Sequence, residues 1–160
     1  MQHLLAGLTA LFPALGMIGS LHAASEEDDE AVVTRVLTDC YSAFSTLDVQ
    51  AILPYFHEPC LIVAPQGVAV APTHSALGAT LAPGMEAFRA RGYARSELTM
   101  LHVKCLSAST ALAAGVAVRY KTDGQELDRA GVIYLLQRVD GSWKIAVIAV
   151  HDADDRLRLE

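Results

Sequence analysis

Hydrophobic positions in the first half of the chain recur with two different periods. From Ala31 to about Thr46, apolar residues return every three or four positions, which is the spacing of a helix with one buried face. A shorter helical pattern follows, and Asp48 stands where it can cap the first turn. The continuous apolar run Cys60–Pro65 then predicts a buried strand.

The second half of the chain predicts one more helix and a series of strands. Apolar residues keep helical spacing between Pro72 and Gly92, and Pro83 followed by Gly84 is expected to kink that helix or divide it in two. The Asp-Gly pairs in "TDGQ" and "VDGS" are hairpin signals, so the last three strands should form an antiparallel meander. This order of elements predicts an α+β fold with helices over one face of a curved sheet. The predicted strands are Arg95–Leu106, Thr110–Lys121, Glu126–Val139 and Ser142–Val150.

Charge and length narrow the class of protein. The chain has 160 residues, enough for one domain with a proper core and too few for two ordinary ones. Twelve Lys and Arg against 18 Asp and Glu give a net charge of -6. Phosphate binding needs clustered basic residues, so a nucleic-acid partner is disfavoured.

The first 24 residues form an apolar segment that ends in small residues, as a secretory signal peptide does. Cleavage after Ala23 or Ala24 would export the protein to the periplasm or the medium. The alternatives are a retained membrane anchor and a cytoplasmic protein whose start is mis-assigned. We therefore divide the chain into a leader (1–24), an acidic linker (25–30), a domain (31–152) and a charged tail (153–160).

The cysteines and glycines indicate no cofactor. Cys40, Cys60 and Cys105 are an odd number without CxxC spacing, which favours three small buried side chains over a disulfide framework or a zinc knuckle. One disulfide plus a free thiol stays open if the compartment is oxidising. The glycines form neither a GxGxxG nor a P-loop pattern, so we expect no nucleotide or flavin.

Residues 140–152, "DGSWKIAVIAVHD", resemble the last strand of the nuclear transport factor 2-like superfamily, where an Asp-Gly turn leads into Trp, a basic residue and Ile. "TLDVQAILPYF" (46–56) and "STALAAGVAVRY" (109–120) extend the resemblance in the family's order. It is closest to SnoaL-like and ketosteroid isomerase-like members, and within them to a bacterial subgroup of unknown function. The resemblance implies a cystatin-like α+β barrel, in which three helices and a cone-shaped, curved antiparallel sheet enclose a pocket. It also implies a homodimer through the outer face of the sheet.

Enzymes of that superfamily hold an acid or a base in an apolar cavity that shifts its pKa. Aligned with the ketosteroid isomerase pattern, the catalytic aspartate falls at Ala64, whose methyl group cannot abstract a proton. The family's tyrosine donor falls at Cys40, next to Tyr41. Steroid isomerase chemistry by that mechanism is therefore disfavoured.

Two histidines are the candidate catalytic bases. Strict alternation along the last strand places His151 on the face of Trp143 and Ile145, at the pocket end of that row, with Asp152 turned away. The alternative is a histidine that merely ends a strand. His57 is a second candidate near the cavity mouth, or a surface loop residue. A zinc site at His57 would lack a fourth ligand.

The remaining candidates are hydrogen-bond donors and a charged pair. Tyr134 and Asp128 share a face of one strand, where they could act on a carbonyl group; the plainer interpretation is a core tyrosine and an acid near water. Arg119 ends a row of small residues and could bind a ligand carboxylate. That row either leaves room for a ligand or packs closely. Tyr41, Tyr55 and Trp143 complete the candidate pocket.

Three functions follow from these observations. The first is a domain that binds a small apolar or aromatic molecule, without turnover. The second is an isomerase, cyclase or lyase that acts on a carbonyl compound, with His151 or His57 as base and Tyr134 or Tyr41 as donor. The third is a non-catalytic dimerisation or partner-binding domain.

Overall fold

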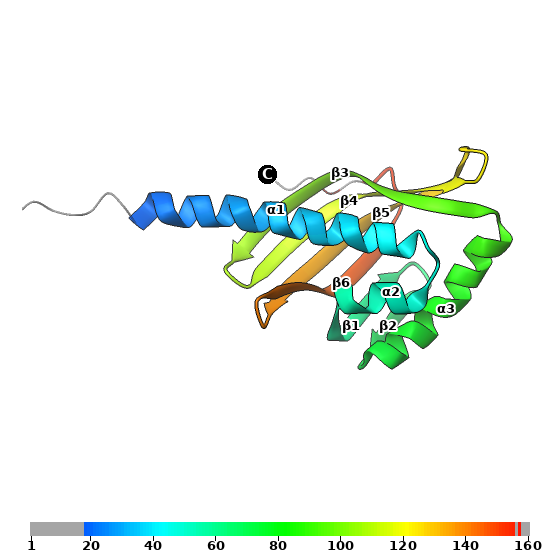
Figure 1. Ribbon diagram of the computed structural model, residues 1–160, viewed down its shortest axis with the longest axis horizontal. Coiled ribbons are helices and arrows are strands. Elements are labelled where there is room, and N and C mark those ends of the chain that lie inside the picture. Colours follow the sequence, from blue (N-terminus) through cyan, green and yellow to red (C-terminus); the bar gives the residue numbers. More distant parts are fainter. Residues whose placement is uncertain (1–17, 156, 158–160) are drawn as a thin grey trace, which may run out of the picture.

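The computed structural model describes residues 18–155 and 157, which form three α-helices and six strands (Figure 1). The helices are α1 (Ile18–Phe44), α2 (Val49–Ile52) and α3 (His74–Ala90), and a 3-10 turn η1 (Leu53–Tyr55) follows α2. The strands are β1 (Phe56–Ala64), β2 (Gly67–Ala71), β3 (Tyr93–Ser107), β4 (Thr110–Lys121), β5 (Glu126–Val139) and β6 (Ser142–His151).

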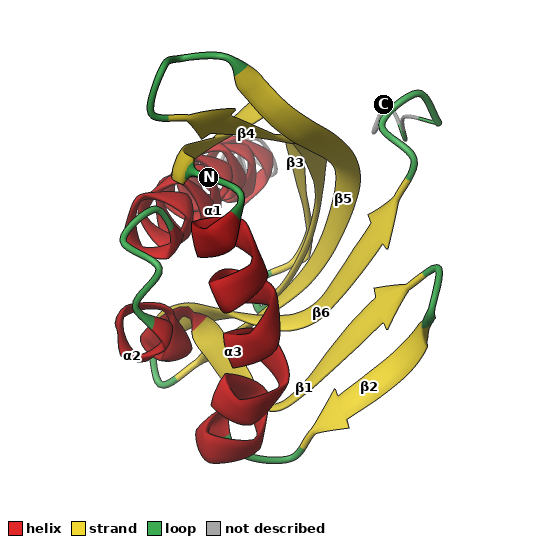
Figure 2. Cartoon of the chain, turned by 90° about the vertical axis from the view of Figure 1, so that its right-hand side faces the viewer, coloured by secondary structure: helices red, strands yellow, loops and turns green. Residues whose placement is uncertain are grey.

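The strands form one curved, open sheet in the order β2-β1-β6-β5-β4-β3, and the helices lie on its concave side (Figure 2). The predicted α+β class is confirmed, and so is the predicted antiparallel meander of the last three strands, β4 to β6. Strand β3 extends the meander by pairing antiparallel with β4. Two features differ from the prediction. Strand β1 pairs with β6 in parallel, and β2, which pairs with β1 through the Pro65-Gln66 turn, was not predicted.

Capping groups and buried apolar side chains hold the helices in place. Val33 and Leu37 of α1 are fully buried against the sheet. The Asp48 carboxylate accepts a hydrogen bond from the Gln50 amide at 2.9 Å and so caps α2, as predicted. Helix α3 is continuous through Pro83, so the expected division into two pieces is wrong. A proline removes one backbone hydrogen bond, but buried Leu77 and Met85 on either side hold both halves of the helix against the core.

The acidic segment expected as a linker is part of helix α1. Asp29 forms an ion pair with Arg138, and the Glu30 carboxylate accepts a hydrogen bond from the Cys105 amide at 3.1 Å. These contacts attach the acidic segment of α1 to β5 and β3. The segment is therefore part of the domain and does not serve as a linker. The predicted leader lies largely outside the described residues. Within the described part of the chain, no helix is both long enough and apolar enough to cross a membrane.

The three cysteines are buried, as the sequence predicts. Burial raises the pKa of the Cys40 thiol to about 12 and that of Cys60 to about 11. Both side chains are therefore neutral thiols at physiological pH and belong to the packing of the core.

Candidate functional site

The concave face of the sheet and the helices enclose a cavity of about 190 Å³. Its wall is apolar nearly throughout and combines side chains from the three helices and from β1, β3, β4, β5 and β6. Phe44, Leu81 and Phe88 come from the helices, and Val132 and Ile148 come from the sheet. Four residues bring polar atoms to this wall: Tyr41, Ser96, Arg119 and Tyr134.

The hydroxyl groups of Tyr41 and Tyr134 lie 2.6 Å apart in the cavity wall. Tyr41 is on α1 and Tyr134 is on β5, so the pair also joins the first helix to the centre of the sheet. Burial raises the pKa of Tyr41 to about 12, against the smaller lowering effects of the hydrogen bond and of the Arg119 charge. Burial, together with the neighbouring Tyr41 hydroxyl, raises the pKa of Tyr134 well above its usual value. Both hydroxyls therefore keep their protons at neutral pH.

Arg119 brings a positive charge to the same wall. One of its terminal nitrogens lies 2.8 Å from an oxygen of Asp128, and the second oxygen of Asp128 lies 2.8 Å from the guanidinium of Arg91. The Arg119 guanidinium carbon also lies 4.7 Å from the centre of the Phe88 ring, within the range of a cation–π contact. These contacts hold the Arg119 side chain in place.

The Nε atom of Arg119 is buried and has no hydrogen-bond partner among the described residues. Buried polar atoms without a partner are uncommon in proteins. Protein atoms enclose this nitrogen, so it does not itself face the cavity in the conformation described.

Ser96 is a site residue that the sequence did not indicate. Its hydroxyl lies 2.6 Å from the Tyr93 hydroxyl, and its amide donates to the Ser45 hydroxyl at 3.0 Å. The Ser45 hydroxyl in turn donates to the Tyr41 carbonyl at 2.8 Å. This chain of bonds fixes α1 against β3 beside the tyrosine pair. No local pattern distinguishes Ser96 from an ordinary strand serine, so only the fold reveals it.

The predicted face of His151 is wrong. Residue Ala146 is bulged out of the pairing between β5 and β6, because Leu135 pairs with Val147 while Leu136 pairs with Ile145. One extra residue reverses the alternation, so Ile148 and Val150 line the cavity. His151 instead lies on the outer face, where its ring covers Gly131. Its Nδ1 lies 2.7 Å from the Asp152 carbonyl oxygen.

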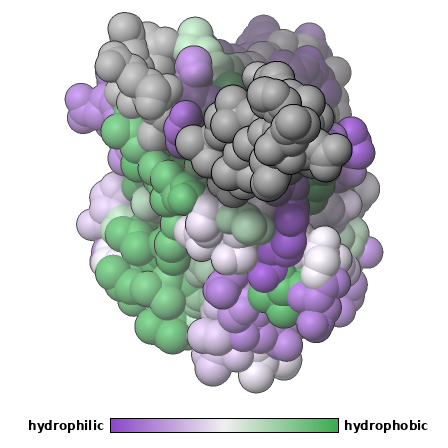
Figure 3. Space-filling view, turned by 90° about the vertical axis from the view of Figure 1, so that its left-hand side faces the viewer, coloured by the Kyte–Doolittle hydropathy of each residue, from purple (hydrophilic) through white to green (hydrophobic). Residues whose placement is uncertain are grey.

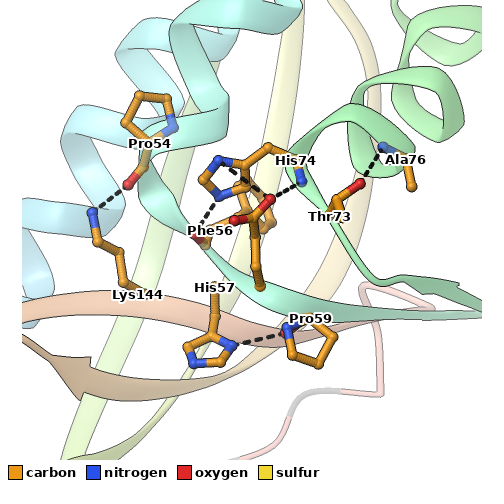
Figure 4. Close-up of polar contacts among 9 residues, drawn as sticks. Pro54, Phe56, His57, Pro59, Thr73, His74, Ala76 and Lys144 are labelled. Atoms are coloured by element: carbon orange, nitrogen blue, oxygen red, sulfur yellow. Dashed lines mark hydrogen bonds and ion pairs between the residues drawn. The ribbon is translucent and has the colours of Figure 1, made fainter.

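His57 also lies away from the cavity. Its Nδ1 is 3.0 Å from the Pro59 carbonyl oxygen, and it lies across the β1 ribbon from His74 (Figure 4). On the other side, Glu58 accepts a hydrogen bond from the His74 amide, and the His74 ring contacts the Phe56 carbonyl oxygen at 2.9 Å. This cluster attaches the start of α3 to β1. Among the described residues, no group of three or more His, Cys, Asp or Glu could hold a metal ion.

The other predicted pocket residues divide between the cavity and its surroundings. Tyr41, Tyr134 and Arg119 meet in one wall, and Asp128 touches that wall through Arg119. Trp143 is buried in the core, with the Arg138 guanidinium 4.7 Å from its ring, and does not line the cavity. Tyr55 packs against the core and is likewise outside the lining.

The row of small residues that leads to Arg119 is closely packed. Ala113 and Ala117 are fully buried. A Cβ atom placed on Gly115 would lie 3.2 Å from the Leu98 side chain and 3.1 Å from the Thr99 carbonyl oxygen. Strand β3 is irregular here, with Met100 at a φ of 51°. The absence of a side chain at Gly115 therefore lets β3 lie close to β4, and none of the small residues of the row lines the cavity.

A curved, open six-stranded sheet with three helices over its concave side defines the cystatin-like class of α+β folds. The chain belongs to the family described as NTF2-like protein (DUF6841), whose sequence profile matches residues 27–153. The resemblance seen in the sequence is thereby confirmed. No curated protein sequence matches the chain.

Several solved structures share the fold. An NTF2-like protein with a cystatin-like fold from Novosphingobium aromaticivorans superimposes with a TM-score of 0.70 at 14% identity, over 89% of this chain and 94% of that one. The protein Aln2 from a Streptomyces species gives 0.66 at 18% identity, over 78% and 90%. A putative scytalone dehydratase from Novosphingobium aromaticivorans gives 0.62 at 17% identity, over 80% and 86%. At such identities the likeness establishes the fold alone.

Proposed function

We propose that the protein binds a small apolar or aromatic molecule in the cavity between the helices and the concave face of the sheet. The observation that carries this proposal is the composition of the wall: a continuous apolar surface into which only a few polar groups project. Ligand sites in proteins have this composition, because apolar area supplies affinity and a few polar groups set orientation.

The size of the cavity limits the ligand. An engineered cavity of about 150 Å³ in another protein binds benzene. At about 190 Å³, this cavity admits one substituted aromatic ring or a short aliphatic chain in the conformation described. A four-ring steroid would require the helices to move.

Acid-base catalysis on a carbonyl compound is the second proposal, and the site supports it less well. Tyr134 and Tyr41 are placed to donate a hydrogen bond to a substrate oxygen. However, the described residues that line the cavity include no histidine and no carboxylate, and His151 and His57 lie elsewhere. We therefore favour binding without turnover.

Calorimetric titration with ethylbenzene, naphthalene and 4-ethylbenzamide tests the binding proposal. We expect at least one of these compounds to bind with a stoichiometry of one per chain and to raise the melting temperature, since a ligand of the folded state stabilises it. The variant Ile148→Phe should weaken binding about tenfold or more, because the added atoms occupy the cavity.

Leu106→Phe is the matched control. Leu106 is 58% exposed at the end of β3 and lies outside both the cavity lining and the outer-face patch, so this variant should bind as the wild type does. The proposal is wrong if none of the three compounds binds, or if both variants weaken binding equally.

We also propose that the protein forms a homodimer through the outer face of the sheet. The outer face carries apolar residues from four neighbouring strands, and Val68 and Val70 are 62% and 64% exposed. Figure 3 shows hydrophobic residues gathered along one side of the molecule. Such a patch on a soluble protein favours an interaction site. The residues are Leu61, Val63, Val68, Val70, Ile133, Leu135, Val147 and Ala149.

A further inference from the structure

The polar atoms of the cavity are mainly hydrogen-bond donors. The tyrosine pair contains two O–H groups, and one of them donates to the other hydroxyl, so the second proton remains available to a ligand. The guanidinium of Arg119 adds N–H donors to the same wall. The Ser96 hydroxyl is bonded to Tyr93. A molecule that satisfies these groups must therefore present acceptor oxygens.

The charge of the cluster distinguishes an anionic ligand from a neutral one. Asp128 is a single carboxylate that contacts two guanidinium groups, so it leaves one unit of positive charge in the cluster. The Arg119 side chain is 17% exposed and the Arg91 side chain is 48% exposed. Water therefore solvates the charge of Arg91 more fully than that of Arg119. The uncompensated positive charge attracts an anion chiefly at Arg119, which lines the cavity.

We infer that the ligand is a small apolar monocarboxylate, and that Arg119 binds its carboxylate while the apolar body fills the cavity. This inference rests on the proposed binding function and adds the chemical class of the ligand. A carboxylate offers two acceptor oxygens, which suits an edge of a guanidinium together with a tyrosine hydroxyl. Phe88 and Asp128 hold the guanidinium in place before the ligand arrives, so little side-chain freedom is lost on binding.

The experiment compares 4-ethylbenzoate with 4-ethylbenzamide by calorimetric titration of the full chain. The two probes have the same ring and the same ethyl group, and only the acid is ionised at neutral pH. We expect 4-ethylbenzoate to bind at least about tenfold more tightly, as charge-assisted hydrogen bonds are the stronger ones. The ratio should also fall as salt is added.

The variants Arg119→Met and Arg91→Gln test which residue causes the preference for 4-ethylbenzoate over 4-ethylbenzamide. Arg119→Met should reduce the ratio of the two affinities to within about threefold, with the amide still bound as in the wild type. Arg91→Gln removes the other partner of Asp128 and does not touch the cavity; because Asp128 then balances Arg119 alone, the preference for the acid should fall, though less than in Arg119→Met. The amide serves as the control for folding, because its affinity reports an intact cavity.

Each outcome has a distinct meaning. Equal affinities of the wild type for acid and amide would overturn the inference and leave the binding proposal standing. A preference that survives in Arg119→Met would overturn the role of Arg119. Failure of both probes to bind would overturn this inference, and the binding proposal would then depend on ethylbenzene and naphthalene. If Arg119→Met does not fold, the wild-type ratio and its salt dependence still decide whether the ligand is anionic.

Discussion

The hydroxyl of Tyr41 lies 2.6 Å from the hydroxyl of Tyr134, although the two residues are 93 positions apart in the chain. Each hydroxyl is the hydrogen-bond partner of the other in a wall that is mostly apolar. The pair therefore serves two purposes: it satisfies two buried polar groups, and it places a hydrogen-bond donor in the cavity. Both purposes can be tested separately.

The losses of unfolding free energy from removing each tyrosine hydroxyl singly should add up to more than the loss from removing both together. In Tyr41→Phe the Tyr134 hydroxyl loses its partner, which costs about 1–3 kcal/mol of unfolding free energy. In the double variant with Tyr134→Phe no orphaned hydroxyl remains, so the loss should be smaller than the sum of the two single losses by about 0.5 kcal/mol or more. Urea denaturation measures these values.

Tyr55→Phe is the matched control for the tyrosine pair, since Tyr55 lies outside the cavity lining. We expect its effect to stay within about 0.5 kcal/mol, as for most substitutions away from a buried network. Strictly additive losses in the two cavity variants would contradict a direct hydroxyl contact.

The same pair should make the protein sensitive to alkaline pH. The folded state raises the pKa of Tyr41 from its usual 10.0 to about 12, so it holds this proton where the unfolded chain has lost it. Stability is then unaffected by these groups below about pH 10 and falls as the pH rises from there toward about 12. Tyr134 is shifted in the same direction.

Absorbance of tyrosinate near 295 nm provides the measurement. The protein has five tyrosines, and we expect at least the Tyr41–Tyr134 pair to resist ionisation when the others have titrated. The variant with both residues changed to Phe should lose this late phase and show a flatter dependence of unfolding free energy on pH. A single titration of all tyrosines near pH 10 would rule out a buried pair.

The sequence predicts where the helices and strands lie in the chain better than it predicts which side of the sheet each strand residue faces. Helical spacing and Asp-Gly turns are local signals, and they located α3 and the meander from β4 to β6. Strand β2 was not predicted, because "GVAVA" is a five-residue edge strand whose pairing depends on β1. A bulge is likewise chosen by pairing between strands, so the alternation of β6 could not reveal the one at Ala146.

The candidate site was predicted in part for the same reason. From Asp128 to Tyr134 and along β4 to Arg119 the pairing of β4 with β5 is regular, so simple alternation assigned the faces of these strands correctly. The structure then brings Tyr134 and Arg119 into one wall with Tyr41. His151 lies beyond the bulge in β6, and alternation placed it on the wrong face. The unpaired Nε of Arg119 and the bonds of Ser96 depend on neighbours far apart in the chain, so they appear only in the folded structure.

Gly131 and His151 provide a test of the outer face. A Cβ atom added at Gly131 would lie 2.1 Å from the His151 ring, so Gly131→Ala must displace the histidine. We expect a loss of about 1–3 kcal/mol in unfolding free energy, of the size found when extra atoms enter a packed site. Adding His151→Ala should restore most of that loss, because the clash is removed. Failure of the second change to rescue the first would contradict this placement.

His151→Ala alone also separates the two proposed functions. The residue lies on the outer face, so the affinity of 4-ethylbenzamide should stay within about twofold of the wild-type value. A tenfold or larger change would indicate that His151 reaches the cavity and would revive its candidacy as a catalytic base. Calorimetric titration under the conditions used for the wild type gives the comparison.

The homodimer proposal makes a prediction about mass in solution. Light scattering during size-exclusion chromatography should give twice the 17.1 kDa of the chain. Val70 is 64% exposed on the outer face, where a buried carboxylate would lack a partner, so Val70→Asp should shift the protein toward the monomer. Ala79→Asp adds the same charge to an exposed position of α3 and should remain dimeric. A monomeric wild type would refute the dimer, and a Val70→Asp variant that stays dimeric would place the interface on another face.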